Sequence, residues 1–246
     1  MTLQEQFEKS GQWLFRWRSY IPLIGLAMAL LALRESNNIG HSESLRLLWG
    51  AVCLGVSFFG LGIRSFTIGH TPKNTSGRNT TCQVADSLNT TGIYSIVRNP
   101  LYLGNFFMFL GIALFPQVWW STVIFTLLFW LYYERIIFAE EAYLREKFGD
   151  AYEAWAESTP AFIPRFRNYK LPSLPFSLKN VLRREYNGFF AVVVCLFFLE
   201  SLSDLFKFNR FELNMQWLVA LGVAFTIWFI LRTLKKKTRI LDVVGR

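Results

Sequence analysis

The first stretch of the chain that could do chemistry lies where a polar segment meets an apolar one. Arg98 and Asn99 stand directly before Pro100, and proline is favoured at the first position of a helix. Both side chains are therefore expected beside the free backbone N–H groups of a helix start, an arrangement that binds carboxylates and phosphates. The structural alternative is an arginine that reaches the membrane surface and an asparagine that caps the helix.

Two adjacent carboxylates, Glu140 and Glu141, follow a long apolar block. A charge at the centre of a lipid-facing helix costs about 2.5–3.5 kcal/mol, and less toward the interface. The pair therefore suits a polar cavity that holds a cation, unless it simply lies in water. Residues 144–155 then carry apolar side chains at spacings of four, three and four. This spacing predicts an amphipathic helix on the membrane surface or over a pocket.

Six apolar blocks must position these residues. The chain of 246 residues is 52% hydrophobic and only 17% charged, whereas an average soluble domain carries about 25% charge. Blocks of this length and polarity span bilayers, and their period is helical rather than alternating. We therefore expect an all-α polytopic membrane protein with about six transmembrane helices, forming a single membrane-integral domain over residues 1–246, and we exclude a soluble enzyme. The blocks cover residues 20–33, 45–63, 101–115, 118–138, 188–202 and 215–231.

The distribution of positive charge predicts the orientation. With a cytoplasmic N-terminus and six crossings, 22 of the 26 Lys and Arg residues lie inside and 4 lie outside. The positive-inside rule then places both termini and both motifs in the cytoplasm. The net charge of +9 is explained by this orientation and by anionic lipid, so we expect no nucleic-acid partner. His41 and His70 are isolated and the three cysteines show no CxxC spacing, so no metal site is expected.

The two motifs together resemble one family. Residues 92–104 follow the pattern G-x-Y-x-x-x-R-N-P-x-Y-x-G, and residues 140–152 follow E-E-x-x-L-x-x-x-F-G-x-x-Y after a helical hairpin. This combination is similar to the isoprenylcysteine carboxyl methyltransferase superfamily, which includes phospholipid methyltransferases and bacterial relatives. The resemblance covers about residues 88–164, which we take as the methyltransferase core: the hairpin and the amphipathic cytoplasmic helix.

The resemblance implies S-adenosylmethionine as methyl donor, bound on the cytoplasmic side. It also implies catalytic roles for Arg98, Asn99 and Glu141. Segment 86–89 occupies the place of a cofactor-contacting segment with different residue types. The residues that correspond to cofactor-binding positions or to the motif around them are Leu88, Tyr94, Arg98, Asn99, Pro100, Leu101, Tyr102 and Glu140.

Two departures from the family pattern bear on the acceptor. Asn99 replaces the usual histidine and cannot titrate, so any role that needs a histidine proton is in doubt. Several relatives carry a substrate-contacting arginine four residues before the first glutamate, where this chain has Ile136, with Arg135 beside it.

The acceptor is expected to be a membrane lipid or a lipidated molecule, with three candidate groups. A phospholipid amine needs a general base, which the motif lacks. A prenylcysteine carboxylate and a lipid phosphate are already anionic, and Ile136 weakens the carboxylate case. A basic strip over residues 165–184 could gather a phosphate, although it also serves as a positive-inside anchor. We therefore predict a lipid phosphate, with lipid A first because a bacterial branch of the superfamily methylates it, in a bacterial inner membrane.

Other functions stay open at this point. The first alternative is isoprenylcysteine carboxylate O-methylation, and another is a membrane-integral NADPH-dependent reductase such as the sterol reductases. A transporter or structural membrane protein is disfavoured, because no span interior holds a lone ionisable residue of the kind that transport sites show. The sequence leaves the oligomeric state undetermined.

Overall fold

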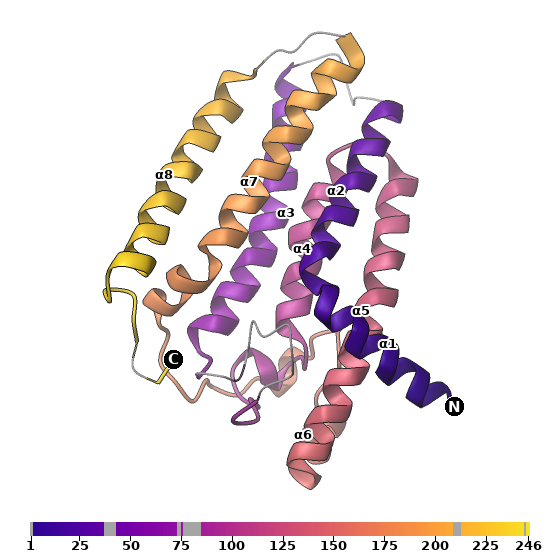
Figure 1. Ribbon diagram of the computed structural model, residues 1–246, viewed down its shortest axis with the longest axis vertical. Helices are drawn as coiled ribbons and strands as arrows, with labels where there is room; N and C mark the ends of the chain where they lie inside the picture. The colour runs from indigo at the N-terminus through magenta and orange to yellow at the C-terminus, as the bar shows by residue number, and fades with distance from the viewer. Residues whose placement is uncertain (1, 37–42, 73–74, 76–84, 209–212, 244) are drawn as a thin grey trace.

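The computed structural model describes residues 2–36, 43–72, 75, 85–208, 213–243 and 245–246 (Figure 1). Within these residues the chain is helical, without strands and with one isolated bridge between Gly92 and Lys170. The expected all-α class is therefore confirmed. The helices are α1 (Leu3–Trp17), α2 (Ile21–Ala32), α3 (Glu43–Gly69), α4 (Pro100–Leu114), α5 (Trp119–Phe148), α6 (Asp150–Ser158), α7 (Leu178–Phe208) and α8 (Met215–Lys237).

Four helices are long and apolar enough to cross a membrane, namely α3, α5, α7 and α8. The chain is therefore a multi-pass membrane protein. Each of the six apolar blocks lies in a helix, but α4 has 15 residues and α2 has 12. At 1.5 Å per residue, α2 measures about 18 Å, less than the roughly 30 Å of a bilayer core. Both stand alongside the longer helices in Figure 1.

The hairpin between α4 and α5 is tight, as the two blocks require. Gln117 adopts a positive φ of 61° and donates its backbone N–H to Leu114 O. The fifth helix then continues without a break past the two glutamates and ends at Gly149, whose φ is +50°. A left-handed φ is accessible to glycine without strain, so the chain can turn here into α6. Glu140 and Glu141 thus belong to the hairpin helix itself.

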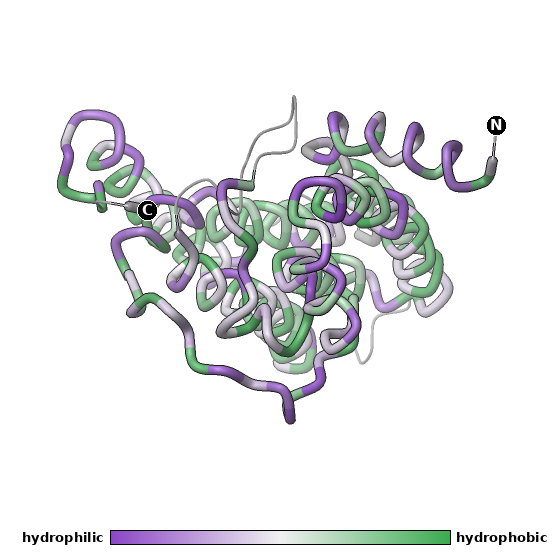
Figure 2. Tube along the Cα trace, turned by 90° about the horizontal axis from the view of Figure 1, so that it is seen from below, coloured by the Kyte–Doolittle hydropathy of each residue, from purple (hydrophilic) through white to green (hydrophobic). Residues whose placement is uncertain are grey.

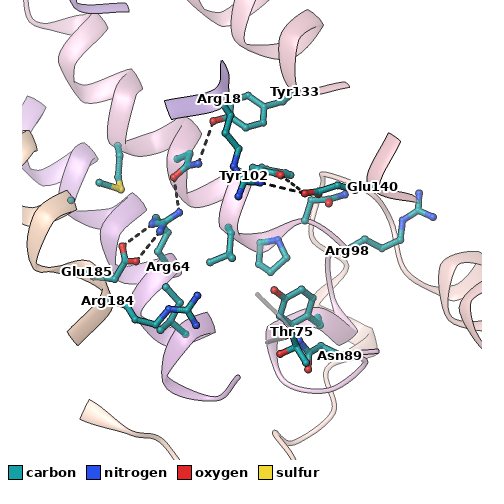
Figure 3. Close-up of a pocket in the computed structure, with 18 of the residues that line it drawn as sticks. Arg18, Arg64, Thr75, Asn89, Arg98, Tyr102, Tyr133, Glu140, Arg184 and Glu185 are labelled. Atoms are coloured by element: carbon teal, nitrogen blue, oxygen red, sulfur yellow. Dashed lines mark hydrogen bonds and ion pairs between the residues drawn. The ribbon is translucent and has the colours of Figure 1, made fainter. Parts of the chain in front are cut away.

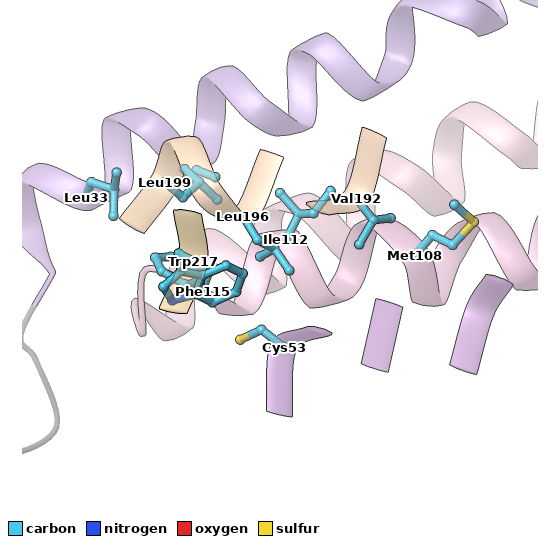
Figure 4. Packing of buried hydrophobic residues seen from close by; sticks show 10 residues of the cluster. Leu33, Cys53, Met108, Ile112, Phe115, Val192, Leu196, Leu199 and Trp217 are labelled. Carbon is cyan, nitrogen blue, oxygen red and sulfur yellow. The ribbon is translucent and has the colours of Figure 1, made fainter. Parts of the chain in front are cut away.

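Close approach of α3 to α4 fixes the centre of the bundle. A Cβ atom on Gly104 would lie 2.5 Å from Arg64 Cγ and 2.8 Å from Gly60 O. Small residues at such crossings let helix backbones approach each other. The buried core continues from there between α3, α4, α7 and α8, and Figure 4 shows its side chains in contact: Cys53, Met108, Ile112, Phe115, Val192, Leu196, Leu199 and Trp217.

The lower end of the bundle in Figure 1 holds both termini, α6 and the segments that join α5 to α7. Figure 2, seen from this end, shows hydrophilic residues along those segments and mainly hydrophobic residues on the helices. The amphipathic α1 crosses α5 here: Tyr132 donates its hydroxyl to Leu14 O at 2.7 Å, and Arg135 Nη1 donates to Ser10 Oγ at 3.2 Å. This end therefore carries the elements that surround the motifs.

Candidate active site

The first motif forms a short loop that a later segment of the chain holds in place. Gly92 has a φ of +61°, which favours glycine, and donates its backbone N–H to Lys170 O at 3.0 Å. Trp155 Nε1 of α6 donates to Tyr94 O at 3.0 Å. The backbone N–H of Arg98 donates to Pro160 O at 2.9 Å. Residues 155–170, which follow the second motif, thus hold the loop of the first motif through hydrogen bonds to its backbone.

The Asn99 side chain also helps to hold this loop in place. Its Nδ2 donates to Ala161 O at 3.2 Å, and its side chain makes no capping hydrogen bond to α4. Pro100 begins α4, as the sequence predicts. The asparagine amide therefore joins the start of α4 to segment 160–164 instead of capping the helix.

Glu140 lies at the centre of the polar contacts between the two motifs. Its carboxylate accepts a hydrogen bond from the Tyr102 hydroxyl at 2.7 Å. Arg18, which follows α1, places Nη1 3.7 Å from the same oxygen. Figure 3 shows this group on one side of the pocket. Charge-assisted hydrogen bonds of this kind fix the position of a carboxylate.

Glu141 lies behind this group. Its Oε1 is 3.3 Å from Arg98 Nε, and the fully buried Tyr152 is its neighbour. Burial raises the pKa of the Tyr152 hydroxyl, and the Glu141 carboxylate raises it further. Glu141 is absent from the lining of the cavity within the part of the chain that the structure describes. Its position is that of a residue that orients Arg98, and the catalytic role stays a prediction.

A cavity of about 860 Å³ lies between α4, α5, α7 and the loop of the first motif. Burial raises the pKa of the Tyr94 hydroxyl at its wall, and the Glu140 carboxylate adds to the rise. Tyr94 therefore remains a hydrogen-bond donor at neutral pH. Every other predicted site residue lines this cavity: Leu88, Tyr94, Arg98, Asn99, Pro100, Leu101, Tyr102 and Glu140.

The opposite wall holds polar residues that the sequence analysis did not identify. Arg64 donates Nε and Nη2 to the two Glu185 carboxylate oxygens, each at 2.8 Å, and Nη1 to Asn105 Oδ1 at 2.7 Å. Asn105 in turn donates to the Tyr133 hydroxyl at 3.3 Å. Arg184 lines the cavity beside them. The available signal was that Arg64 follows an apolar block directly, since ionisable residues next to membrane spans can mark functional sites.

The structure also locates Ile136 and Arg135 and the residues that were considered as metal ligands. Ile136 is fully buried and lies outside the cavity lining among the described residues, and Arg135 stacks over Phe7 of α1 at 4.6 Å. Neither therefore supplies a cation to the cavity. No group of three His, Cys, Asp or Glu side chains in the described ranges could hold a metal ion. His41 and Cys82 lie outside the described residues.

Comparisons with known proteins agree with this architecture. The family described as phospholipid methyltransferase matches residues 50–151. The protein-S-isoprenylcysteine O-methyltransferase of Schizosaccharomyces pombe is 42% identical over 75 residues, which cover 30% of this chain and 32% of that protein. A probable protein-S-isoprenylcysteine O-methyltransferase of Oryza sativa subsp. indica is 35% identical over 75 residues, covering 30% of this chain and 39% of the plant protein.

A longer match joins the chain to a bacterial protein. The nickel-cobalt-cadmium resistance protein NccN of Alcaligenes xylosoxydans xylosoxydans is 31% identical over 159 residues, which cover 64% of this chain and 67% of that protein. No solved structure matches. The chain belongs to the same family as this bacterial protein. The family match and the yeast and rice relatives confirm the resemblance to the superfamily of isoprenylcysteine and phospholipid methyltransferases. The chain spans only about a third of the length of the yeast and rice relatives.

Proposed function

We propose that the protein is an S-adenosylmethionine-dependent methyltransferase that methylates an anionic oxygen of a membrane-embedded acceptor. The observation that carries this proposal is the cavity between the two motif halves. Glu140 and Tyr102 face it from one side, and Arg64 with Glu185 faces it from the other (Figure 3). A carboxylate and a guanidinium on opposite walls suit a cationic and an anionic reactant, respectively.

The residues present fit the cofactor. The sulfonium, ammonium and ribose hydroxyls of S-adenosylmethionine are all groups that a carboxylate such as Glu140 can hold, and Arg98 can pair with its carboxylate. Tyr94, Pro100 and Tyr102 would complete its binding site. A volume of about 860 Å³ lies within the range of about 300–1,000 Å³ that ligand pockets have. When bound, this cofactor supplies an electrophilic methyl group.

The charges of the cavity favour an anionic acceptor over an amine. Its described lining contains four arginines and two glutamates, and no histidine. A protonated amine would meet this positive excess and would need a base to become a nucleophile. An anionic oxygen instead already carries the lone pair that would take up the methyl group supplied by S-adenosylmethionine, which Glu140 and Arg98 would hold, so no base is required. No proton moves, and the site needs only to place the reactants and exclude water.

Two anionic acceptors have a specific observation in their favour. The names of the yeast and rice relatives favour an isoprenylcysteine carboxylate, which we place first. The presence of Ile136 at the place where other relatives carry an arginine for their acceptor favours a lipid phosphate such as that of lipid A. The names of these relatives give no support to lipid A. Of the basic strip, Arg165, Arg167 and Lys170 are exposed, and only Arg184 is among the described cavity lining.

We further propose a topology of six spans, with α2 and α4 crossing beside the four long helices. Both termini lie at the lower end of the bundle (Figure 1), which fits an even number of crossings. The excess of positive charge supports a cytoplasmic location for that end and for the cofactor site, in a bacterial inner membrane. Residues 1–246 then form one membrane-integral domain with the methyltransferase core at 88–164.

Methyl transfer to defined acceptors tests the proposal. Purified protein in detergent is incubated with S-adenosylmethionine that carries a labelled methyl group, and with N-acetyl-S-farnesylcysteine, lipid A or phosphatidylethanolamine. We expect label in an ester of one of the two anionic acceptors, heavier by one CH₂ unit in the mass spectrum. Label in the amine of phosphatidylethanolamine would contradict the anionic acceptor. Binding of NADPH without S-adenosylmethionine binding would favour a reductase.

A further inference from the structure

The cavity continues beyond the residues of the two motifs, along a groove between α4 and α7. Four of the α7 residues that line it are three or four positions apart, so these four share one face of the helix for about three turns. These four are Glu185, Gly188, Val192 and Cys195, and the α4 residues opposite include Asn105, Met108 and Ile112. We call this groove the inner branch.

The inner branch changes from polar to apolar along its length. Its lower end holds the Arg64–Glu185 pair, Asn105 and Arg184, whereas its upper part is lined by side chains such as Met108, Ile112 and Val192 (Figures 3 and 4). Ligand sites that are mostly apolar and carry a few convergent polar groups recognise amphiphiles in a fixed orientation. A charged head at the lower end and a hydrocarbon chain above it fit this gradient.

Arg64 is held so that its guanidinium faces the cavity. Its stem packs against Gly104, the last glycine of the first motif, where a Cβ would lie 2.5 Å from Arg64 Cγ. Glu185 and Asn105 fix the guanidinium through three N–H donors. A guanidinium has five N–H donors, so two are not used by these bonds. The presence of glycine at position 104 therefore has a physical reason, because a larger residue would clash with the arginine of α3.

We infer that the inner branch is the acceptor site: Arg64, with Arg184 beside it, binds the anionic headgroup of an amphiphile, and its chain lies along Met108, Ile112 and Val192. This inference rests on the proposed function and names the residues that receive its acceptor. Arg64 thereby provides from α3 the cation that Ile136 does not provide from α5. The shared chemistry is an anionic oxygen on a single hydrocarbon chain, as a carboxylate or as a phosphate.

This site is tested with four ligands that share the same farnesyl chain and differ in their headgroup. Binding of N-acetyl-S-farnesylcysteine, farnesyl phosphate, farnesol and farnesylamine is measured by calorimetry on the full-length protein in nonionic detergent. We expect Arg64→Gln to weaken the two anions about tenfold or more and to leave farnesol unchanged. Arg34→Gln is the control, because Arg34 is an exposed arginine at the upper end and is not part of the described cavity lining. Equal losses in both variants, or equal affinity of wild type for farnesol and the anions, would overturn the inference.

Two more variants keep the test decisive if Arg64→Gln fails to fold. Glu185→Gln keeps a hydrogen-bond acceptor for Arg64 and removes a negative charge, so anion affinity should rise; a fall would contradict the site. Gly188→Leu should fill the inner branch and weaken all four probes. The tighter of the two anions identifies the acceptor class. Titration with S-adenosylmethionine is run in parallel: wild type that binds no S-adenosylmethionine defeats the proposed function, while the amphiphile results still decide this inference.

Discussion

Two arginines of α3 pair with carboxylates of α7 at opposite ends of the bundle. At the upper end, Arg46 contacts Glu200, with Nε 3.0 Å from Oε1, and also Asp204. At the lower end, Arg64 pairs with Glu185 through two hydrogen bonds. The acidic partners are almost completely buried in both cases. The two groups are therefore similar in residue type, in burial and in the helices that they join.

The difference lies in their surroundings. Leu33, which begins the turn Leu33–Glu35, lies beside Leu199 at the upper end, and neither Arg46 nor its partners line the described cavity (Figure 4). At the lower end Gly104 admits the Arg64 stem, and Gly188 lines the cavity next to Glu185. A buried ion pair by itself is weak evidence of function. The small residues around the lower pair make the difference, because they let a cavity reach the charge.

The largest effect is expected from loss of the upper arginine. Arg46→Gln leaves two buried carboxylates without their cation, and breaking a buried pair lowers the free energy of unfolding by about 3–5 kcal/mol. Arg64→Gln leaves one such carboxylate and should lower it less. Denaturant unfolding in detergent compares the two variants. An Arg46→Gln protein as stable as wild type would show that the upper pair is not a structural link.

Variants that widen the α3–α4 crossing should affect ligand binding differently at the two ends of the bundle. Gly104→Ala and Gly111→Ala each introduce a Cβ into close contact with α3, and overpacking typically costs about 1–3 kcal/mol. Both variants should lose stability to a similar extent. Only Gly104→Ala should weaken binding of farnesyl phosphate severalfold, because it displaces Arg64. Calorimetry separates them, and an equal loss of binding in both variants would remove the distinction between the ends.

The smallest effect is expected from the loss of Arg18 near the lower end or of Arg34 at the upper end. Arg18 lies 3.7 Å from Glu140, which is long for an ion pair, so Arg18→Gln should lower S-adenosylmethionine affinity by about fivefold at most. Arg34 at the upper end stacks over Phe206 at 5.7 Å, and Arg34→Gln serves as its control with unchanged affinity. A loss above tenfold in the Arg18 variant would give α1 a larger role at the site than this geometry supports.

Much of the fold could be predicted from sequence, because apolar blocks of this length can satisfy their backbone in lipid only as helices. The number of crossings could not, since α2 and α4 are shorter than a bilayer core and depend on their neighbours. The continuation of α5 past Glu140 was also missed. Charged residues there suggested a boundary, but good helix formers such as Glu, Ala and Arg sustain the helix to Gly149.

The residues of the candidate site also divide into those that the sequence could predict and those that only the structure identifies. The motif residues lie within two short segments, so the family resemblance could assign Tyr102 and Glu140 to one cofactor site, and the structure shows that their side chains are in contact. Arg18, Arg64 and Glu185 come from three other helical segments, and only tertiary packing brings them to the cavity. The placement of Glu141 behind Arg98 follows from the helical rotation between adjacent residues, which turns one glutamate toward the cavity and the other away from it.

The most direct test of the account is calorimetric titration of purified protein with S-adenosylmethionine, for wild type, Glu140→Gln and Glu134→Gln. Glu134 is an exposed glutamate of the same helix and serves as the matched control. We predict one binding site in wild type, affinity about tenfold lower or weaker in Glu140→Gln, and no change in Glu134→Gln. Wild-type protein that binds no S-adenosylmethionine, or a Glu140→Gln variant with unchanged affinity, would contradict the account.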